Sequence, residues 1–270
     1  MLRQRLHKSL LVWRGRFGRW AEFLDTASVR FRLRLAAHPV VQLAAGWYAL
    51  QRGRPQEGLD RFDRLLRHHS DDVSALAGKA ACLLALKRYQ DAADIYKRLI
   101  SIAPWNDRAR YNDGVLLSRL GHFGAAAVQF RAVLDRDPTH ADALYNLAAL
   151  AQRDGRLREA RDAWVAYAQL RPNDAAAWFN LGVVYLDFEQ PFQAVRCLSI
   201  AVAIDPDNSD GHVNLAVAEA RSGHPEAALE ALNVADELSP CDPTIVQMLA
   251  DLRGSLAAWS PLEVPDDPTP

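Results

Sequence analysis

Small and large apolar residues recur along the chain with a period of 34 residues. The period is marked by five evenly spaced prolines: Pro104, Pro138, Pro172, Pro206 and Pro240. With the proline at position 32, residues 39–242 divide into six units: 39–72, 73–106, 107–140, 141–174, 175–208 and 209–242. Units of this length predict a helical array, because each unit can bury its apolar face only against its neighbours.

Three positions of the unit predict two closely packed helices. Position 8 is always small: Gly46, Ala80, Gly114, Ala148, Gly182, Ala216. Position 20 is also small: Gly58, Ala92, Ala126, Ala160, Ala194, Ala228. Position 24 lies on the same face of the second helix and is large and apolar: Phe62, Tyr96, Phe130, Trp164, Leu198, Leu232. We expect the backbones to approach at the small residues, with a turn near position 15, where four units have Gly53, Gly121, Gly155 and Gly223.

These columns resemble the tetratricopeptide repeat family. The fifth unit matches the family signature with Trp178, Leu181, Gly182, Tyr185, Ala194, Leu198 and Pro206. Units two and three depart from it, because Lys79 and Asp113 occupy a leucine column of the first helix, and we expect looser packing there. The resemblance implies an all-α fold, a right-handed α-solenoid of about six helix-turn-helix repeats over residues 39–242.

The two ends of the chain predict further elements. Residues 243–259 read as a helix that caps the last repeat, with apolar residues at helical spacing: Ile245, Leu249, Leu252, Leu256, Trp259. Residues 260–270, with four prolines and three acids, predict a disordered tail. Residues 1–38 carry nine Lys/Arg against two acids and predict a basic amphipathic helical segment, with a narrow apolar seam: Leu6, Leu10, Trp13, Phe17, Trp20, Leu24, Ala27, Phe31.

Three roles are open for this N-terminal segment. It can cap the first repeat or dock a partner, because a solenoid needs its first core face covered. Its arginines and tryptophans also suit an anionic membrane surface. A cleaved organellar transit peptide would share the arginine richness and the scarcity of acids.

In the family, the first helices of successive repeats line a concave groove, and the resemblance places the candidate binding residues there. Position 6 has asparagine in four repeats: Asn112, Asn146, Asn180, Asn214. A carboxamide can pair with both the N–H and the C=O of a peptide, so these residues predict binding of an extended segment. Aromatic residues stand at position 5, namely Tyr111, Tyr145 and Phe179, and arginines at position 13, namely Arg119, Arg153 and Arg221. Together they favour an apolar ligand with acidic residues.

Position 9 narrows the ligand class. Val115, Val183 and Val217 stand where many relatives carry asparagine, so capture of a bare C-terminal carboxylate is disfavoured and a hydrophobic strand or helix fits better. The alternative is that asparagine, aromatic and arginine columns reflect the family's average sequence, with the true partner bound elsewhere.

The composition and the absence of known motifs argue against catalytic activity and metal binding. The three cysteines, Cys82, Cys197 and Cys241, form no CxxC pair and, with no secretory signal, indicate a reducing, cytoplasmic setting. No sequence motif of a catalytic centre, phosphate loop or metal site is present, and no stretch is apolar enough to span a membrane. The body of the chain offers no basic face for nucleic acid.

The sequence therefore predicts a non-enzymatic protein that needs no cofactor or metal. We expect a scaffold, adaptor or assembly chaperone that binds a peptide or protein segment in its concave groove. Two alternatives stay open: a membrane-peripheral assembly factor held by the basic N-terminal helix, and an accessory binding subunit of an enzyme complex.

Overall fold

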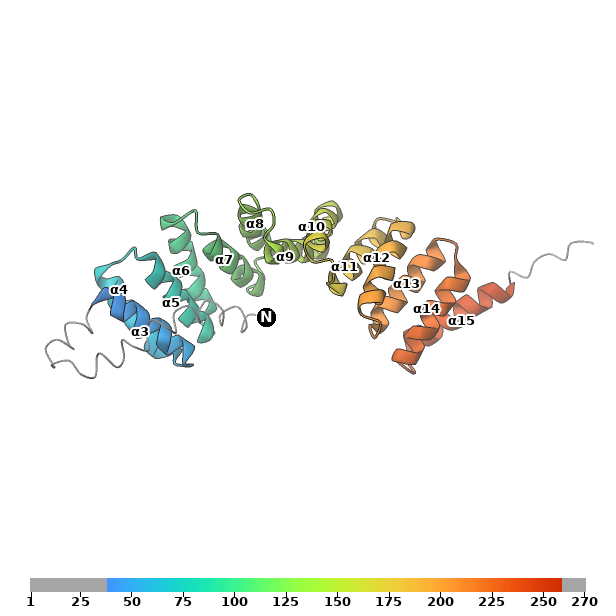
Figure 1. Cartoon of the computed structure of the whole chain (residues 1–270), viewed down its shortest axis with the longest axis horizontal. Helices are drawn as coiled ribbons and strands as arrows, with labels where there is room; N and C mark the ends of the chain where they lie inside the picture. Colours follow the sequence, from blue (N-terminus) through green and yellow to red (C-terminus); the bar gives the residue numbers. More distant parts are fainter. Residues whose placement is uncertain (1–37, 259–270) are drawn as a thin grey trace, which may run out of the picture. The chain divides into compact units, whose positions relative to one another are not determined.

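A computed structural model describes residues 38–258 of the chain, with the side chains of residues 38–254 (Figure 1). The described residues form thirteen α-helices and no strand. The helices are α3 (Pro39–Gln51), α4 (Pro55–His68), α5 (Val73–Ala85), α6 (Tyr89–Ile102), α7 (Asp107–Arg119), α8 (Phe123–Leu134), α9 (Ala141–Arg153), α10 (Leu157–Leu170), α11 (Ala175–Asp187), α12 (Pro191–Ile204), α13 (Ser209–Arg221), α14 (Pro225–Leu238) and α15 (Pro243–Ala258). The predictions made for residues 1–37 and for the tail lie outside the described residues.

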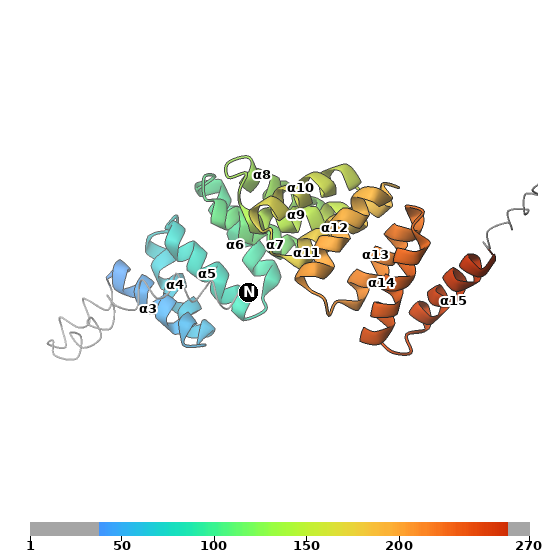
Figure 2. The same cartoon turned by 45° about the vertical axis from the view of Figure 1, so that its right-hand side comes forward.

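The described residues divide into two compact units, and the boundary lies between Ala132 and Val133, inside α8. In the first unit, each helix from α3 to α7 packs against the next. In the second, each helix from α9 to α15 does the same (Figure 2). This packing of consecutive helix pairs confirms the predicted all-α solenoid class.

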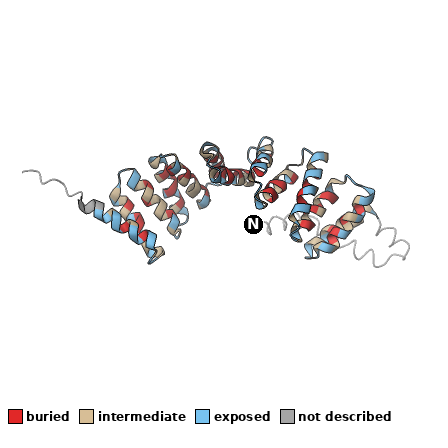
Figure 3. Cartoon of the chain, turned by 180° about the vertical axis from the view of Figure 1, so that it is seen from behind, coloured by how far each residue is buried: buried red, intermediate tan, exposed pale blue. Residues whose placement is uncertain are grey.

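The small residues at positions 8 and 20 and the large residue at position 24 are buried in every repeat. Figure 3 shows buried residues, in red, along the helices of both units. All six large residues at position 24 are buried, with between 0% and 3% of their surface exposed. A Cβ added to Gly46, Gly114 or Gly182 would lie 2.7, 2.8 or 2.5 Å from the large residue of the same repeat. These distances leave no space for a side chain, so glycine is needed there for the two helices to approach.

The turn between the two helices of a repeat uses a left-handed residue at position 15. Gly53, Gly121, Gly155 and Gly223 have φ between +69° and +82°. Lys87 and Glu189 occupy the same position in the second and fifth repeats, with φ of +61° and +55°. The turn geometry is therefore conserved along the chain although two of its residues carry the steric cost of a Cβ.

The first helices from α5 to α13 begin at a capping side chain at position 34 of the preceding repeat. Each cap accepts a hydrogen bond from a backbone N–H two or three residues further on, over 2.8 to 3.2 Å; the caps are Asp72, Asn106, His140, Asp174 and Asn208. Such bonds satisfy one of the free N–H groups at a helix start. Four of these caps follow a proline by two residues, whereas Asp72 follows Ser70. The cap, with the proline where it is present, thus fixes where one repeat ends and the next begins.

The two polar residues in the leucine column are placed differently. Lys79 is 25% exposed and its Nζ lies 2.6 Å from Asp63 Oδ1 of the preceding repeat. Asp113 is only 2% exposed, and its buried Oδ1 has no hydrogen-bond partner among the described residues. Burial raises the pKa of Asp113 to about 6, while the positive charges of Lys97 and Arg110 act in the opposite direction.

The C-terminal helix α15 packs on α14 as predicted. Ile245 and Leu249 are buried against Leu232 and Ala235, with Leu252 half-buried beside them. This contact covers apolar residues that would otherwise end the array in contact with water. The side chain of Leu256 and the whole of Trp259 lie outside the described part.

Candidate protein-binding face

The predicted binding residues all lie on first helices, but they fall in both units. Helix α7 of the first unit carries Tyr111, Asn112, Val115 and Arg119. Helices α9, α11 and α13 of the second unit carry the remaining nine: Tyr145, Asn146, Arg153, Phe179, Asn180, Val183, Asn214, Val217 and Arg221. Each unit therefore presents its own set of these side chains.

The asparagines of the second unit are held by their own helices. The Nδ2 groups of Asn146, Asn180 and Asn214 each donate to the backbone carbonyl oxygen four residues earlier, over 2.7, 2.8 and 2.8 Å. This bond uses one amide hydrogen and fixes the side chain against the helix. The carboxamides of Asn180 and Asn214 each keep a second N–H and two acceptor lone pairs, so they can pair with a ligand at a reduced cost in side-chain entropy.

Asn112 of the first unit has a different partner. It forms a hydrogen bond with the hydroxyl of Tyr96, on the second helix of the preceding repeat. Burial raises the pKa of this hydroxyl to about 12, and the bond with Asn112 opposes the rise. Asn112 thus joins two repeats, a role that its place in the asparagine column did not predict.

The aromatic column lies partly in the core. The ring centroid of Tyr145 is 5.1 Å from that of Trp164 and 5.4 Å from that of Tyr167, both in edge-to-face geometry. Tyr145 is nevertheless 38% exposed, so one part of its ring is open to a ligand. Tyr111 packs on Phe130, with ring centroids 5.9 Å apart. Phe179 is half-buried against the apolar cluster of α12 and α13.

The valines at position 9 are half-buried, and Val217 packs against the same cluster as Phe179. Together with Tyr145 and Phe179, Val183 and Val217 give the second unit a partly apolar first-helix face. This face can accept an apolar side chain, although much of its own surface is already covered.

The arginines at position 13 contact neighbouring residues. Arg119 donates from a terminal guanidinium nitrogen to the Tyr89 hydroxyl over 3.2 Å, and its guanidinium carbon lies 5.3 Å from the ring centroid of Tyr89. Arg221 donates to the carbonyl oxygen of Leu186 over 3.4 Å. In both cases the partner belongs to the preceding repeat. Arg153 lies 3.6 Å from the carboxylate of Asp154. The guanidinium groups of Arg119 and Arg221 therefore link neighbouring repeats in addition to facing solvent.

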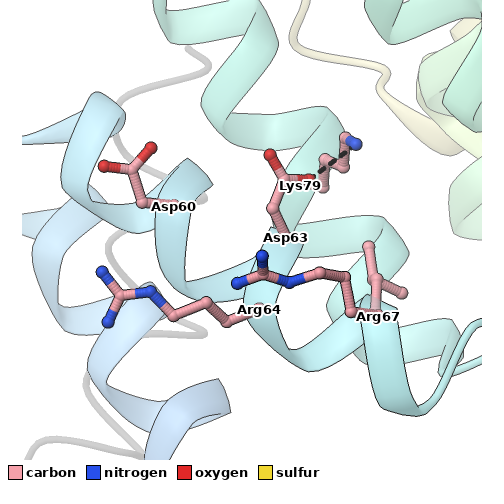
Figure 4. Close-up of a pocket in the computed structure, with 6 residues that line it drawn as sticks. Asp60, Asp63, Arg64, Arg67 and Lys79 are labelled. Atoms are coloured by element: carbon pink, nitrogen blue, oxygen red, sulfur yellow. Dashed lines mark ion pairs between the residues drawn. The ribbon is translucent and has the colours of Figure 1, made fainter.

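A feature that the sequence analysis missed lies between α4 and α5 (Figure 4). It is a solvent-open hollow of about 570 Å³ lined by Asp60, Asp63, Arg64, Leu66, Arg67 and Lys79. Its sequence signal is the pair Arg64 and Arg67, which are three residues apart on one helix and so share a face. The 34-residue columns hide this signal because it occurs in one repeat alone.

No described helix has the length and apolar character needed to cross a bilayer. In the described part, no group of three or more His, Cys, Asp or Glu side chains is arranged to hold a metal ion. The thiols of Cys82 and Cys197 are buried, and desolvation raises their pKa to about 12 and about 11. These thiols are protonated near neutral pH and are therefore poor nucleophiles.

Comparison with known proteins identifies the repeats. Profiles described as tetratricopeptide repeat match residues 43–107, 149–191 and 185–243, and a second profile of the same description matches residues 130–162. The chain belongs to the tetratricopeptide repeat family. Tetratricopeptide repeats form a fold that mediates protein–protein interaction. No curated protein matches the full sequence significantly.

Solved structures share the fold at low sequence identity. YrrB, described as a TPR protein with an unusual peptide-binding site, is 19% identical, with a TM-score of 0.64 over 70% of this chain and 97% of YrrB. MamA is 20% identical, with a TM-score of 0.56 over 59% of this chain and 93% of MamA. The C-terminal part of a TPR repeat-containing protein from Cytophaga hutchinsonii is 18% identical, with a TM-score of 0.63 over 80% of this chain and 87% of that one.

Proposed function

We propose that this chain is a scaffold, adaptor or assembly chaperone that binds a peptide or protein segment on the first helices of its second unit. The observation that carries the proposal is the repeated placement of Asn146, Asn180 and Asn214. Each carboxamide is held in the same way by its own helix, one repeat apart. Evenly spaced and pre-oriented amides suit the regular N–H and C=O groups of an extended chain.

The side chains beside the asparagines indicate which residue types the bound segment would carry. Tyr145, Phe179, Val183 and Val217 are partly accessible and would take apolar side chains of the bound segment. Arg153 and Arg221 are exposed and favour acidic residues at the edge of the segment. We propose that Asn112, Tyr111, Val115 and Arg119 of the first unit bind in the same manner, with Asn112 weakened by its bond to Tyr96.

The comparisons support this proposal at the level of the fold. YrrB is described as having a peptide-binding site, and Naa15/Naa10 was solved bound to HypK-THB, with a TM-score of 0.60 at 16% identity. This chain spans 34% of that second protein chain. Such likeness makes protein partners the natural class to test, while the residues involved are argued from this chain alone.

The test uses the full chain and a double variant, Asn146→Ala/Asn180→Ala. Partners co-purified with the wild-type protein are identified, and a synthetic segment of one of them is titrated by calorimetry. We expect the double variant to bind about tenfold more weakly, because each lost carboxamide bond costs about 0.5–1.5 kcal/mol. Helicity and melting temperature should stay close to wild type, since alanine is the better helix former.

Gln169→Ala is the matched control, because Gln169 is an exposed carboxamide on the second helix α10. It should bind the segment with wild-type affinity. If the double variant also keeps wild-type affinity, the binding site lies on another face and the proposal is wrong. The membrane-peripheral alternative rests on residues 1–38, and the accessory-subunit alternative would show a catalytic partner among the co-purified proteins.

A further inference from the structure

The charges on helix α4 are paired unevenly. Glu57 accepts from both Arg54 and Arg61, over 2.9 and 2.8 Å. Asp63 pairs with Lys79 on α5 over 2.6 Å. The remaining acid, Asp60, accepts a hydrogen bond from the Gln56 amide over 3.0 Å. The acidic side chains of this helix therefore already have partners.

Two arginines of the same helix do not. Arg64 and Arg67 are exposed, and among the described residues neither has an ion pair or a hydrogen bond. Figure 4 shows both guanidinium groups directed to the same side of α4, at the hollow between α4 and α5. Lys79 lines the same hollow from α5, held in place by Asp63. The hollow thus has two unpaired cations on a rigid helix.

We propose that this hollow binds an oxyanion group, a carboxylate or a phosphomonoester, of an acidic protein segment. The guanidinium group presents a planar set of N–H donors that matches two oxygens of such a group. Two guanidinium groups three residues apart can hold two oxyanions of one segment or share one dianion. The side chain of Leu66 adds an apolar contact beside them.

A protein segment fits better than a small molecule. The hollow is open to solvent, so it would leave most of a free anion exposed and give it little affinity. A segment gains further contacts along the second helices, where Arg98 occupies in the next repeat the position that Arg64 has in the first. Arg98 is already paired, since it donates to the Ser70 carbonyl oxygen and to Asp71, over 2.9 and 3.1 Å, so a segment would share it with Asp71 and would find its unpaired cations at Arg64 and Arg67.

The experiment measures binding of fluorescein-labelled peptides to the full-length chain by anisotropy. The probes are a hexaglutamate peptide, a neutral peptide with a single phosphoserine, and a hexaglutamine peptide of equal length. We expect the first or second probe to bind with an affinity that falls as salt rises, and hexaglutamine not to bind. The stronger of the two anionic probes identifies the oxyanion.

The variants are Arg64→Gln, Arg67→Gln and the double substitution, with Arg196→Gln as the control. Arg196 is an exposed arginine on α12 with no ion pair among the described residues. Each single variant should weaken the anionic probe about threefold and the double variant about tenfold, with Arg196→Gln unchanged. Circular dichroism should be the same for all four, since these side chains are exposed.

Wild-type affinity in the double variant overturns the inference, as does equal binding of hexaglutamine. Tighter binding of a single-stranded RNA oligonucleotide than of either anionic peptide would show a nucleic-acid site and would also overturn it. The inference does not rest on the asparagine face. Because the asparagine face is also proposed to take acidic residues, the deciding readout is the loss caused by Arg64→Gln/Arg67→Gln. This loss should be about tenfold in the Asn146→Ala/Asn180→Ala background as well as in the wild-type chain, so failure of one proposal is distinguishable from failure of the other.

Discussion

Lys79 and Asp63 belong to successive repeats, and their charged groups lie 2.6 Å apart. Lys79 stands at position 7, where repeats four to six have Leu147, Leu181 and Leu215, and Asp63 stands at position 25. At the next junction the same two positions carry the opposite charges, Lys97 at position 25 and Asp113 at position 7. The first unit therefore has opposite charges at these two positions of neighbouring repeats, and they form an ion pair at the first junction, where the second unit has leucine at position 7.

Exchanging the charges of this pair tests the relationship. Lys79→Asp alone should destabilise the chain by about 1–2 kcal/mol, because it places two carboxylates together beside the core. Lys79→Asp/Asp63→Lys should recover most of the loss, with a coupling of about 1 kcal/mol measured from urea midpoints in a double-mutant cycle. The same cycle on Arg88 and Asp91, an exposed pair within one repeat, should give less than about 0.5 kcal/mol. Equal coupling in both cycles would contradict a special role for Lys79 and Asp63.

The buried Asp113 predicts a dependence of stability on pH. Its pKa in the folded chain is about 6, above the ordinary value of 3.8, so the folded chain holds this proton more tightly than the unfolded chain. The contribution of Asp113 to the free energy of unfolding is therefore greatest below pH 4 and falls as pH rises from about 4 to about 6. Above pH 6 the loss is complete and amounts to about 3 kcal/mol.

Asp113→Leu removes the titrating group and restores the residue type of repeats four to six. The variant should be more stable than wild type at pH 7.5, and this difference should shrink by about 2 kcal/mol at pH 4. Urea unfolding of both proteins at the two pH values measures it. A difference that does not change with pH would show that Asp113 has an ordinary pKa.

Lys87 and Glu189 predict stabilising substitutions. Both have positive φ at a turn position where the other four repeats have glycine. Lys87→Gly and Glu189→Gly should each raise the free energy of unfolding by about 0.5 kcal/mol, because the steric cost of the Cβ exceeds the added chain entropy of glycine. The reverse change, Gly155→Ala at φ of +69°, should lower it by about 1 kcal/mol. Destabilisation by both glycine substitutions would mean that the lysine and glutamate side chains contribute at these turns.

Substitution of Gly182 tests the close contact between the two helices of the fifth repeat. A Cβ at this residue would lie 2.5 Å from Leu198 Cγ. Gly182→Ala should therefore destabilise the chain by about 1–3 kcal/mol, whereas alanine is favoured over glycine at an open helical site. Gly254→Ala on α15 is the control, because nothing lies within 4 Å of its added Cβ. Thermal melting of the two variants should shift in opposite directions, and a stabilised Gly182→Ala would disprove the close contact.

The repeat architecture could be predicted from the sequence because it depends on residues that recur. Two packed helices require small residues at positions 8 and 20, a large residue at position 24 and, at the end of the unit, proline at position 32. These residue types recur from one repeat to the next, so the sequence reveals them. The left-handed turn at Gly53, Gly121, Gly155 and Gly223 was predictable for the same reason.

The contacts of the candidate site were not predictable in this way. Arg119 was expected to face a ligand, yet it also contacts Tyr89, which lies thirty residues earlier. Asn112 was grouped with three other asparagines, yet its partner is Tyr96. These partners differ from one repeat to the next, so a column that is uniform in sequence is not uniform in its contacts. The opposite charges at positions 25 and 7 were visible in the sequence but needed the structure to show that those positions meet.

The bond between Arg221 and the Leu186 carbonyl has a consequence for any ligand of the second unit. An acidic side chain that takes this guanidinium removes a link between the fifth and sixth repeats, whereas a ligand that leaves it in place does not. Occupancy and the stiffness of that junction are thus thermodynamically coupled. An acidic ligand that binds Arg221 would make the junction between the fifth and sixth repeats more flexible. Stretching the helical array would in turn alter the affinity for that ligand.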